Sequence, residues 1–181
     1  NVTDMSWMFY NANSFNQDIG NWDVSNVTNM YGLFYSANFF NGDIEDWDVG
    51  NVIYMAYLFH DATSFNQDVG GWNVIKVADM TGMFYNATSF NQDIGGWNVG
   101  NVTNMGYMFR DATSFNQDIG GWNVSNVMYM GLMLYGISLS ENNYDALLCG
   151  WSQLNLINNI TFSGGDSNYC NCNEERQNII N

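Results

Sequence analysis

Carboxylate side chains recur in the sequence every 25 residues, a spacing that could bring oxygen ligands together. One column comprises Asp18, Asp43, Asp68, Asp93 and Asp118. Stacked carboxylates suit Ca²⁺, but Asp and Asn side chains also satisfy backbone donors in tight turns. Calcium repeats usually carry several Asp and Gly residues per turn, and this column supplies one Asp. We therefore expect a structural ladder without a cofactor, with bound Ca²⁺ as the alternative.

A second polar column could form a binding face. It comprises Asp23, Asp48, Asn73, Asn98 and Asn123, each between a Trp and a Val that we expect to face inward. On neighbouring strands about 4.8 Å apart, Asp23 and Asp48 would resemble the carboxylate pair of a retaining glycosidase. Any stacked array produces this separation, and the later units carry Asn. We expect no enzyme activity and interpret the column as a candidate binding face.

Cysteine and histidine do not add a catalytic or metal site. Cys149, Cys170 and Cys172 follow the repeats, and Cys-x-Cys lacks the second pair that a zinc site needs. In an exported protein we expect a disulfide from Cys149 to Cys170 or Cys172, which leaves one thiol. His60 is the single histidine, and no serine or cysteine nucleophile recurs in register with it.

Six sequons could carry N-linked glycans in an exported protein. They begin at Asn1, Asn26, Asn86, Asn101, Asn123 and Asn159. Asn and Thr are also common capping groups at the start of a helix, so the repeated Asn-Val-Thr has a structural explanation as well.

These columns belong to a 25-residue repeat. Five full units occupy residues 1–125, a sixth begins at residue 126, and the pattern ends after Tyr135. We therefore divide the chain into a repeat region, 1–135, and a C-terminal capping region, 136–181. Apolar residues recur in seven columns, which begin at Val2, Met5, Phe9, Phe15, Ile19, Trp22 and Val24. One unit cannot bury such a face alone, so each unit must cover the next.

The apolar spacing within a unit predicts one short helix and one short strand. Val27, Met30, Phe34 and Ala37 follow helical spacing, whereas Trp22 and Val24 alternate as in a strand. We expect a right-handed α/β solenoid that resembles leucine-rich repeats, with an all-β helix as the alternative. Beyond it, Ser140 precedes a helical pattern that includes Leu147 and Trp151 and would cap the last unit. The N-terminal edge has no such cap, so we expect either that more protein precedes residue 1 or that something, such as another copy, docks there.

Composition excludes several partners. The formal net charge is −15, with three Lys and Arg residues, so neither nucleic acid nor an anionic membrane would meet a cationic surface. No apolar run is long enough to cross a bilayer. The chain opens on Asn1-Val-Thr without a basic and apolar leader, so we expect a processed or partial product from which any export signal has been removed.

Three recurring strings resemble the BspA-like family of surface-protein repeats. They are Trp22-Asp-Val-Ser-Asn-Val-Thr-Asn-Met30, Met108-Phe109, and Ser-Phe-Asn-Gln-Asp-Ile-Gly at 14–20, 89–95 and 114–120. The resemblance implies a leucine-rich-repeat-like solenoid at the cell surface that is used for adhesion and has no defined catalytic residues. The predicted function is therefore an extracellular scaffold that attaches to a protein or glycan. The alternative is a structural subunit that assembles head to tail into a filament.

Overall fold

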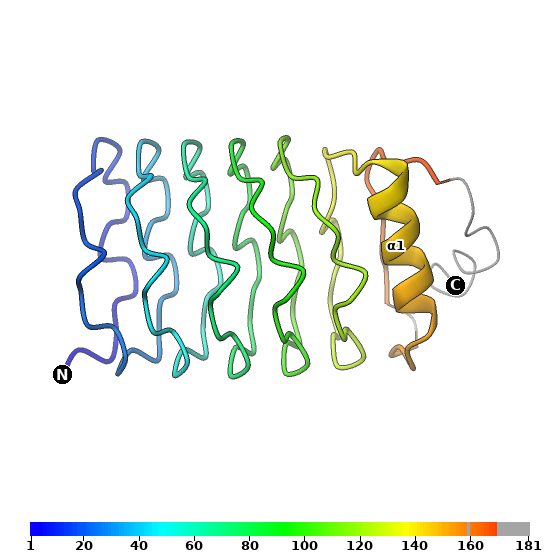
Figure 1. Ribbon diagram of the computed structural model, residues 1–181, viewed down its shortest axis with the longest axis horizontal. Helices are drawn as coiled ribbons and strands as arrows, with labels where there is room; N and C mark the ends of the chain where they lie inside the picture. The colour runs from blue at the N-terminus through cyan, green and yellow to red at the C-terminus, as the bar shows by residue number, and fades with distance from the viewer. Residues whose placement is uncertain (159, 170–181) are drawn as a thin grey trace.

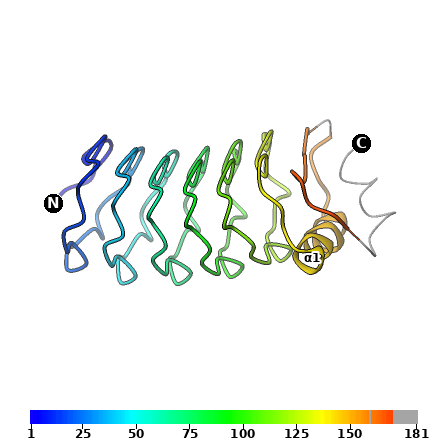
Figure 2. The ribbon, with the colours of Figure 1, turned by 90° about the horizontal axis from the view of Figure 1, so that it is seen from above.

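The repeat units form successive coils that lie side by side. The structure is a computed structural model and describes residues 1–158 and 160–169. Figure 1 shows the N-terminus at one end of the row of coils and helix α1, Glu141–Ser152, across the other end. Seen from above, in Figure 2, the coils keep the same order and α1 lies against the last of them.

Backbone hydrogen bonds join each coil to the next in a fixed register. In the second unit, Met30 N–H donates to the Tyr54 carbonyl at 2.9 Å, and Phe34 N–H donates to the Leu58 carbonyl at 3.0 Å. The N–H groups alternate in direction: that of Leu33 closes a turn on the Met30 carbonyl at 3.2 Å, and that of Gly32 donates to the Ala56 carbonyl of the next coil at 2.9 Å. Isolated parallel bridges accompany this pattern at Asp4↔Asn29, Asn29↔Tyr54, Tyr54↔Asp79, Asp79↔Asn104 and Asn104↔Tyr129.

The helix predicted in every unit is wrong: among the described residues, α1 is the one helix. The segment 31–36 is a run of turns. Two residues per unit there have a positive φ, which an α-helix excludes. These residues are Trp7, Gly32, Tyr57, Gly82, Tyr107 and Leu132 in one column, and Asn11, Ser36, Asp61, Asn86, Asp111 and Gly136 in the other. Every second N–H in this segment donates to the next coil, as those of Gly32, Phe34 and Ser36 do, so the backbone gains bonds between units instead of a helix.

The strand predicted around Trp22 and Val24 is also absent from the described repeat region. The ladder contacts lie instead at the Asn29 register, within the segment expected to start the helix. The bridges are isolated, so neither a continuous parallel strand nor an all-β helix describes a unit. Right-handed solenoid winding stays a prediction.

The core is a stack of aromatic and aliphatic columns. Phe34, Phe59, Phe84 and Phe109 are fully buried, and their rings stack between units with centroids 5.5 to 5.7 Å apart. Each also stacks on a second Phe of its own unit, as Phe59 does on Phe65 at 3.8 Å. The seven predicted columns are buried in the interior units, and an eighth, with Leu33 and Met83 among its members, is buried as well.

Tryptophan links the coils with polar contacts inside this apolar core. The indole N–H of Trp47 donates to the Ile19 carbonyl at 3.1 Å, and that of Trp97 donates to the Val69 carbonyl at 3.0 Å. Trp72 and Trp122 repeat the bond in the other interior units. A buried indole therefore has its one donor satisfied by the preceding coil.

The helix predicted after Ser140 is present as α1, Glu141–Ser152. The Ser140 side chain accepts a hydrogen bond from Asn143 N–H, and the helix buries Tyr144, Leu147, Leu148 and Trp151 against the last coils. Residues 160–162 form no strand. Phe162 nevertheless joins the core beside Trp151, with ring centroids 5.3 Å apart.

Candidate binding surface

The predicted binding face is exposed, and each of its side chains also holds a turn. Oδ1 of Asp23 accepts from Ser25 N–H at 3.1 Å and from the Ser25 hydroxyl at 2.6 Å. Hydrogen bonds from Ser25 lower the pKa of Asp23. Oδ1 of Asp48, Asn73, Asn98 and Asn123 likewise accepts from the backbone N–H two residues on. Because one oxygen closes the turn, the other polar atoms of this face remain available to a ligand.

The Asp column that was considered for Ca²⁺ also closes turns with its side chains. Oδ1 of Asp18, Asp43, Asp68, Asp93 and Asp118 accepts from the N–H two residues on, at 2.8 to 3.1 Å. Among the described residues, no group of three or more His, Cys, Asp or Glu side chains could hold a metal ion. The geometry therefore provides a turn-closing role for these carboxylates.

One hollow lies beside this column between the first two coils. Residue 42 is Gly where later units have Gln67, Gln92 and Gln117, whose side chains donate to the preceding coil. The open space measures about 450 Å³ and is lined by Asn16, Gln17, Asp18, Gly20, Asn21, Asn41, Gly42, Asp43 and Asp46. Three carboxylates line it, those of Asp18, Asp43 and Asp46.

The sequon asparagines take part in the coil contacts. Asn101 donates its side-chain amide to the Ile75 carbonyl at 2.7 Å, and Asn86 donates to Oδ1 of Asp61 at 2.7 Å. Asn1, Asn26 and Asn123 are exposed, and Asn159 lies outside the described residues. A glycan at Asn86 or Asn101 would therefore attach to an amide that already bridges two coils.

Cys149 is exposed on α1 and is disulfide-bonded. The two candidate partners, Cys170 and Cys172, lie outside the described residues, so the pairing stays a prediction.

Aromatic side chains form a surface that the sequence reasoning missed. The central part of this surface is a stack of side chains, one from each coil, which we call the aromatic column. It comprises Tyr10, Tyr35, His60, Tyr85, Arg110 and Tyr135. Its neighbours are Trp7, Tyr31, Tyr57, Tyr107 and Tyr129, which contact the column or one another. These residues, together with the exposed Tyr54, which has the register of Tyr129, are called the aromatic surface. The available signal was the recurrence of Tyr as the tenth residue of a unit.

His60 is held between two tyrosine rings in this column. Its ring stacks on Tyr35 at 4.1 Å and on Tyr85 at 4.4 Å, within 10° of parallel in each case. The Arg110 guanidinium continues the stack between Tyr85 and Tyr135, with its carbon 5.3 and 4.9 Å from the ring centroids. A cation between two rings gains from both quadrupoles, so the column has one fixed positive charge.

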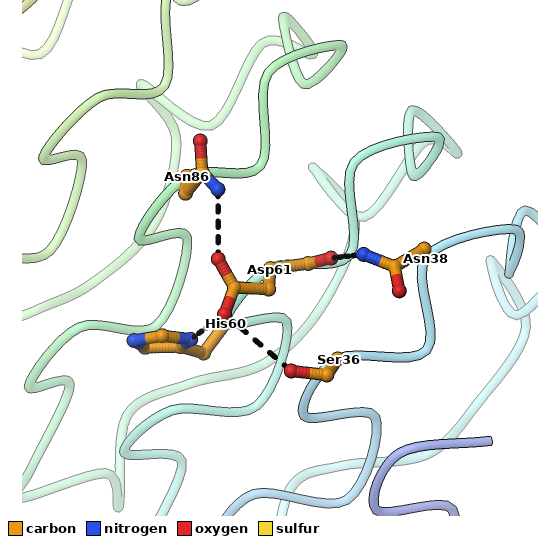
Figure 3. A network of polar contacts seen from close by, with 5 residues as sticks. All are labelled: Ser36, Asn38, His60, Asp61 and Asn86. Atoms are coloured by element: carbon orange, nitrogen blue, oxygen red, sulfur yellow. Dashed lines mark hydrogen bonds and ion pairs between the residues drawn. The ribbon is translucent and has the colours of Figure 1, made fainter. Parts of the chain in front are cut away.

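Asp61, the residue after His60, accepts hydrogen bonds from the coils before and after its own, as Figure 3 shows. Its carboxylate accepts from Asn86 Nδ2 at 2.7 Å and from the Ser36 hydroxyl at 3.4 Å, and its carbonyl accepts from Asn38 Nδ2 at 2.8 Å. Nδ1 of His60 is 3.0 Å from Oδ2 of Asp61 but is not directed along a hydrogen bond. Burial lowers the pKa of His60, and the Asp61 charge opposes this effect more weakly.

The outer rim of the aromatic surface is exposed to solvent. Tyr10, Tyr135, Trp7 and Tyr129 are 51%, 49%, 44% and 43% exposed, and Tyr54, in the same column as Tyr129, is 50% exposed. The Tyr129 hydroxyl donates to that of Tyr107 at 3.3 Å, which raises the pKa of Tyr129. Rigid aromatic rings at the surface provide contact area at a low entropy cost.

Comparison with known proteins places the chain in a family. A family model described as Mycoplasma protein of unknown function, DUF285, matches residues 1–88 and 67–159. The chain belongs to the DUF285 family. The matched residues span the repeats of this DUF285 chain and α1. No curated protein and no solved structure matches it. Within the described ranges, this DUF285 protein has no helix with the length and hydropathy of a membrane span.

Proposed function

We propose that this DUF285 chain is a non-enzymatic attachment module of the BspA-like kind, displayed outside the cell, that binds a protein or glycan ligand. The observation that carries the proposal is the aromatic surface, which runs along the coils and exposes Trp and Tyr rings. Tyr and Trp are enriched at binding hot spots because they bury large areas with few rotatable bonds. The proposal treats the stack as a solenoid, whose length offers an extended surface.

The charge of the chain favours ligands with basic or uncharged groups. The formal net charge of −15 includes the exposed Asp23 and Asp48 and the acidic hollow around Asp43. Arg110 is stacked between rings and paired with Asp111 at 3.2 Å, so it adds little to an anion-binding surface. Electrostatic complementarity mainly sets the association rate and the specificity, so aromatic contacts would provide most of the affinity.

The experiment is a binding screen against immobilised glycans and extracellular-matrix proteins with matched variants. Tyr54→Ser combined with Tyr129→Ser removes two exposed rings at the ladder register. Phe39→Ser is the control, because Phe39 is 65% exposed and lies outside the aromatic surface. We expect the double variant to weaken binding by at least about tenfold and the control to leave it unchanged. Equal binding by all three proteins, or no ligand in the screen, would refute the proposal.

A second pair of variants separates charge from aromatic contact. Asp23→Lys with Asp48→Lys reverses two exposed charges on the candidate binding face. If the ligand is basic, this pair slows association and reduces its salt dependence. If the ligand is an uncharged glycan, the pair leaves binding intact while Tyr54→Ser with Tyr129→Ser still weakens it.

A further inference from the structure

Two tyrosine hydroxyls from adjacent coils contact each other at the surface. The Tyr129 hydroxyl of the sixth coil lies 3.3 Å from the Tyr107 hydroxyl of the fifth. The two ring centroids are 6.2 Å apart, and the ring planes meet at 53°. Tyr129 is 43% exposed, and Tyr107 is half-buried. The phenol ends of the two side chains therefore lie next to each other where a dissolved reagent can reach them.

Backbone contacts hold both tyrosines in this position. Met105 N–H donates to the Tyr129 carbonyl at 2.8 Å, and Tyr107 N–H donates to the Gly131 carbonyl at 3.0 Å. Gly106 makes room for the Tyr129 ring, because a Cβ there would collide with Cε1 and Cδ1 of that ring. The ladder thus fixes the two residues relative to each other, and the glycine lets the Tyr129 ring lie across the fifth coil.

Their equivalents in the second and third coils lack this arrangement. Tyr54 has the register of Tyr129, but Gly32 stands where the fifth coil has Tyr107, so Tyr54 meets no phenol at that position. Tyr31 and Tyr57 have ring centroids 5.5 Å apart, but their planes meet at 66° and, in the part of the chain that the structure describes, their hydroxyls do not contact each other. The hydroxyl contact therefore singles out Tyr107 and Tyr129.

Phenol ends in contact can form a carbon–carbon bond on oxidation. Loss of one electron and the hydroxyl proton from each ring gives two phenoxyl radicals, whose unpaired electrons extend to the ring carbons next to the oxygen. These carbons are the Cε atoms, and one bond forms between a Cε of each ring. The hydrogen on each bonded Cε then leaves as a proton, and each phenol oxygen takes up a proton again. The chain loses two hydrogen atoms, and one molecule of hydrogen peroxide is reduced to two of water.

We propose that Tyr107 and Tyr129 are a dityrosine site, at which a peroxidase with hydrogen peroxide joins the fifth coil to the sixth. Because the fold already holds the two phenols together, coupling within the chain is favoured over coupling between chains. The new bond links residues 22 apart, and it restricts the unfolded chain as a disulfide does. The modification needs no ligand, so it goes beyond the attachment function.

The test treats the protein at low concentration with a haem peroxidase and hydrogen peroxide, followed by trypsin digestion and mass spectrometry. Arg110 lies between the two tyrosines, so trypsin separates their peptides unless a cross-link joins them. We expect joined peptides and dityrosine fluorescence from the folded wild type and neither from Tyr107→Phe. Tyr85→Phe is the control, because Tyr85 lies in the same tryptic peptide as Tyr107, and it should leave the yield unchanged. A folded wild type without joined peptides, or joined peptides that persist in Tyr107→Phe, would overturn the proposal.

Two further measurements test the role of the fold. In urea-unfolded protein the yield of joined peptides should fall, because the two phenols are no longer adjacent; an undiminished yield would overturn the proposal. The oxidised wild type should melt at a higher temperature than the oxidised Tyr107→Phe protein, and equal melting temperatures would contradict a bond between the coils. Neither assay contains a ligand, so the outcome is separate from that of the binding screen.

Discussion

Replacing Trp97 by Phe tests whether the tryptophan bonds hold the coils together. Trp97 is 3% exposed, and its indole donates to the Val69 carbonyl at 3.0 Å. That carbonyl also accepts from Trp72 N–H at 3.1 Å, so the change removes one bond without leaving the carbonyl unpaired. The lost hydrogen bond costs about 0.5–1.5 kcal/mol, and the smaller ring costs about 1–2 kcal/mol in burial and cavity.

The expected destabilisation is therefore about 1.5–3.5 kcal/mol, to be measured by urea unfolding followed by far-UV circular dichroism. Trp22→Phe is the matched control, because Trp22 has the same register, is 42% exposed and lacks the indole bond in the described chain. It should cost less than about 1 kcal/mol. In a stack held by nearest-neighbour contacts, amide exchange should quicken most in the coils on either side of Trp97. Equal losses in the two variants would refute the reasoning.

Three further predictions follow from particular contacts. Burial lowers the pKa of His60, so the neutral ring stabilises the fold above about pH 6.5, and this contribution is lost as the pH falls below that value. The melting temperature of the wild type should therefore fall more steeply with acid than that of His60→Tyr. Parallel curves for the two proteins would contradict the assignment. Gly82→Ala should lower the free energy of unfolding in urea by about 1–3 kcal/mol, because Gly82 has φ +54° and a Cβ there would meet the Tyr57 ring. Gly71→Ala is the control and should be neutral, because its Cβ would meet nothing within 4 Å. Similar free energies for the two changes would be evidence against left-handed turns. Calcium at about 1 mM should leave the melting temperature unchanged, because Oδ1 of each column carboxylate already closes a turn, and a rise of several degrees would favour the calcium interpretation.

The sequence was sufficient for the period, the buried columns and the cap helix. Those features depend on apolar side chains alone, and residues such as Val27, Phe34 and Trp47 must be covered in any stack of identical units. Ser140 and the apolar spacing after it identify α1, because no repeat contact competes with the helix there.

The conformation of each unit could not be predicted in the same way. The spacing of Met30, Phe34 and Ala37 suits a helix, but it also suits successive turns that bury the same side chains. The available signal was one column, which carries Asn, Ser, Asp or Gly in every unit, as at Ser36, and these residues favour or tolerate a positive φ. The other positive-φ column gave a weaker signal, because it holds Trp, Tyr or Leu as well as Gly. Bonds between coils 25 residues apart then outweigh local helical preference.

The candidate site was only partly predictable for a related reason. Asp23 and Asp48 were expected to face outward, and they do. Tyr35, His60 and Tyr85 share one register of the repeat and were interpreted as a surface column of the expected helix, but that interpretation did not predict that their rings stack. The turns place these rings in a single stack.

The central claim is that the chain binds its ligand through the aromatic surface. Oxidative footprinting of the bound complex, read by peptide mass spectrometry, tests it most directly. The attachment account predicts that ligand protects the exposed rings of Tyr54, Tyr129 and Tyr135, while Phe39 keeps its free-state rate of oxidation. Protection confined to Phe39 and other positions outside the aromatic surface would contradict the account.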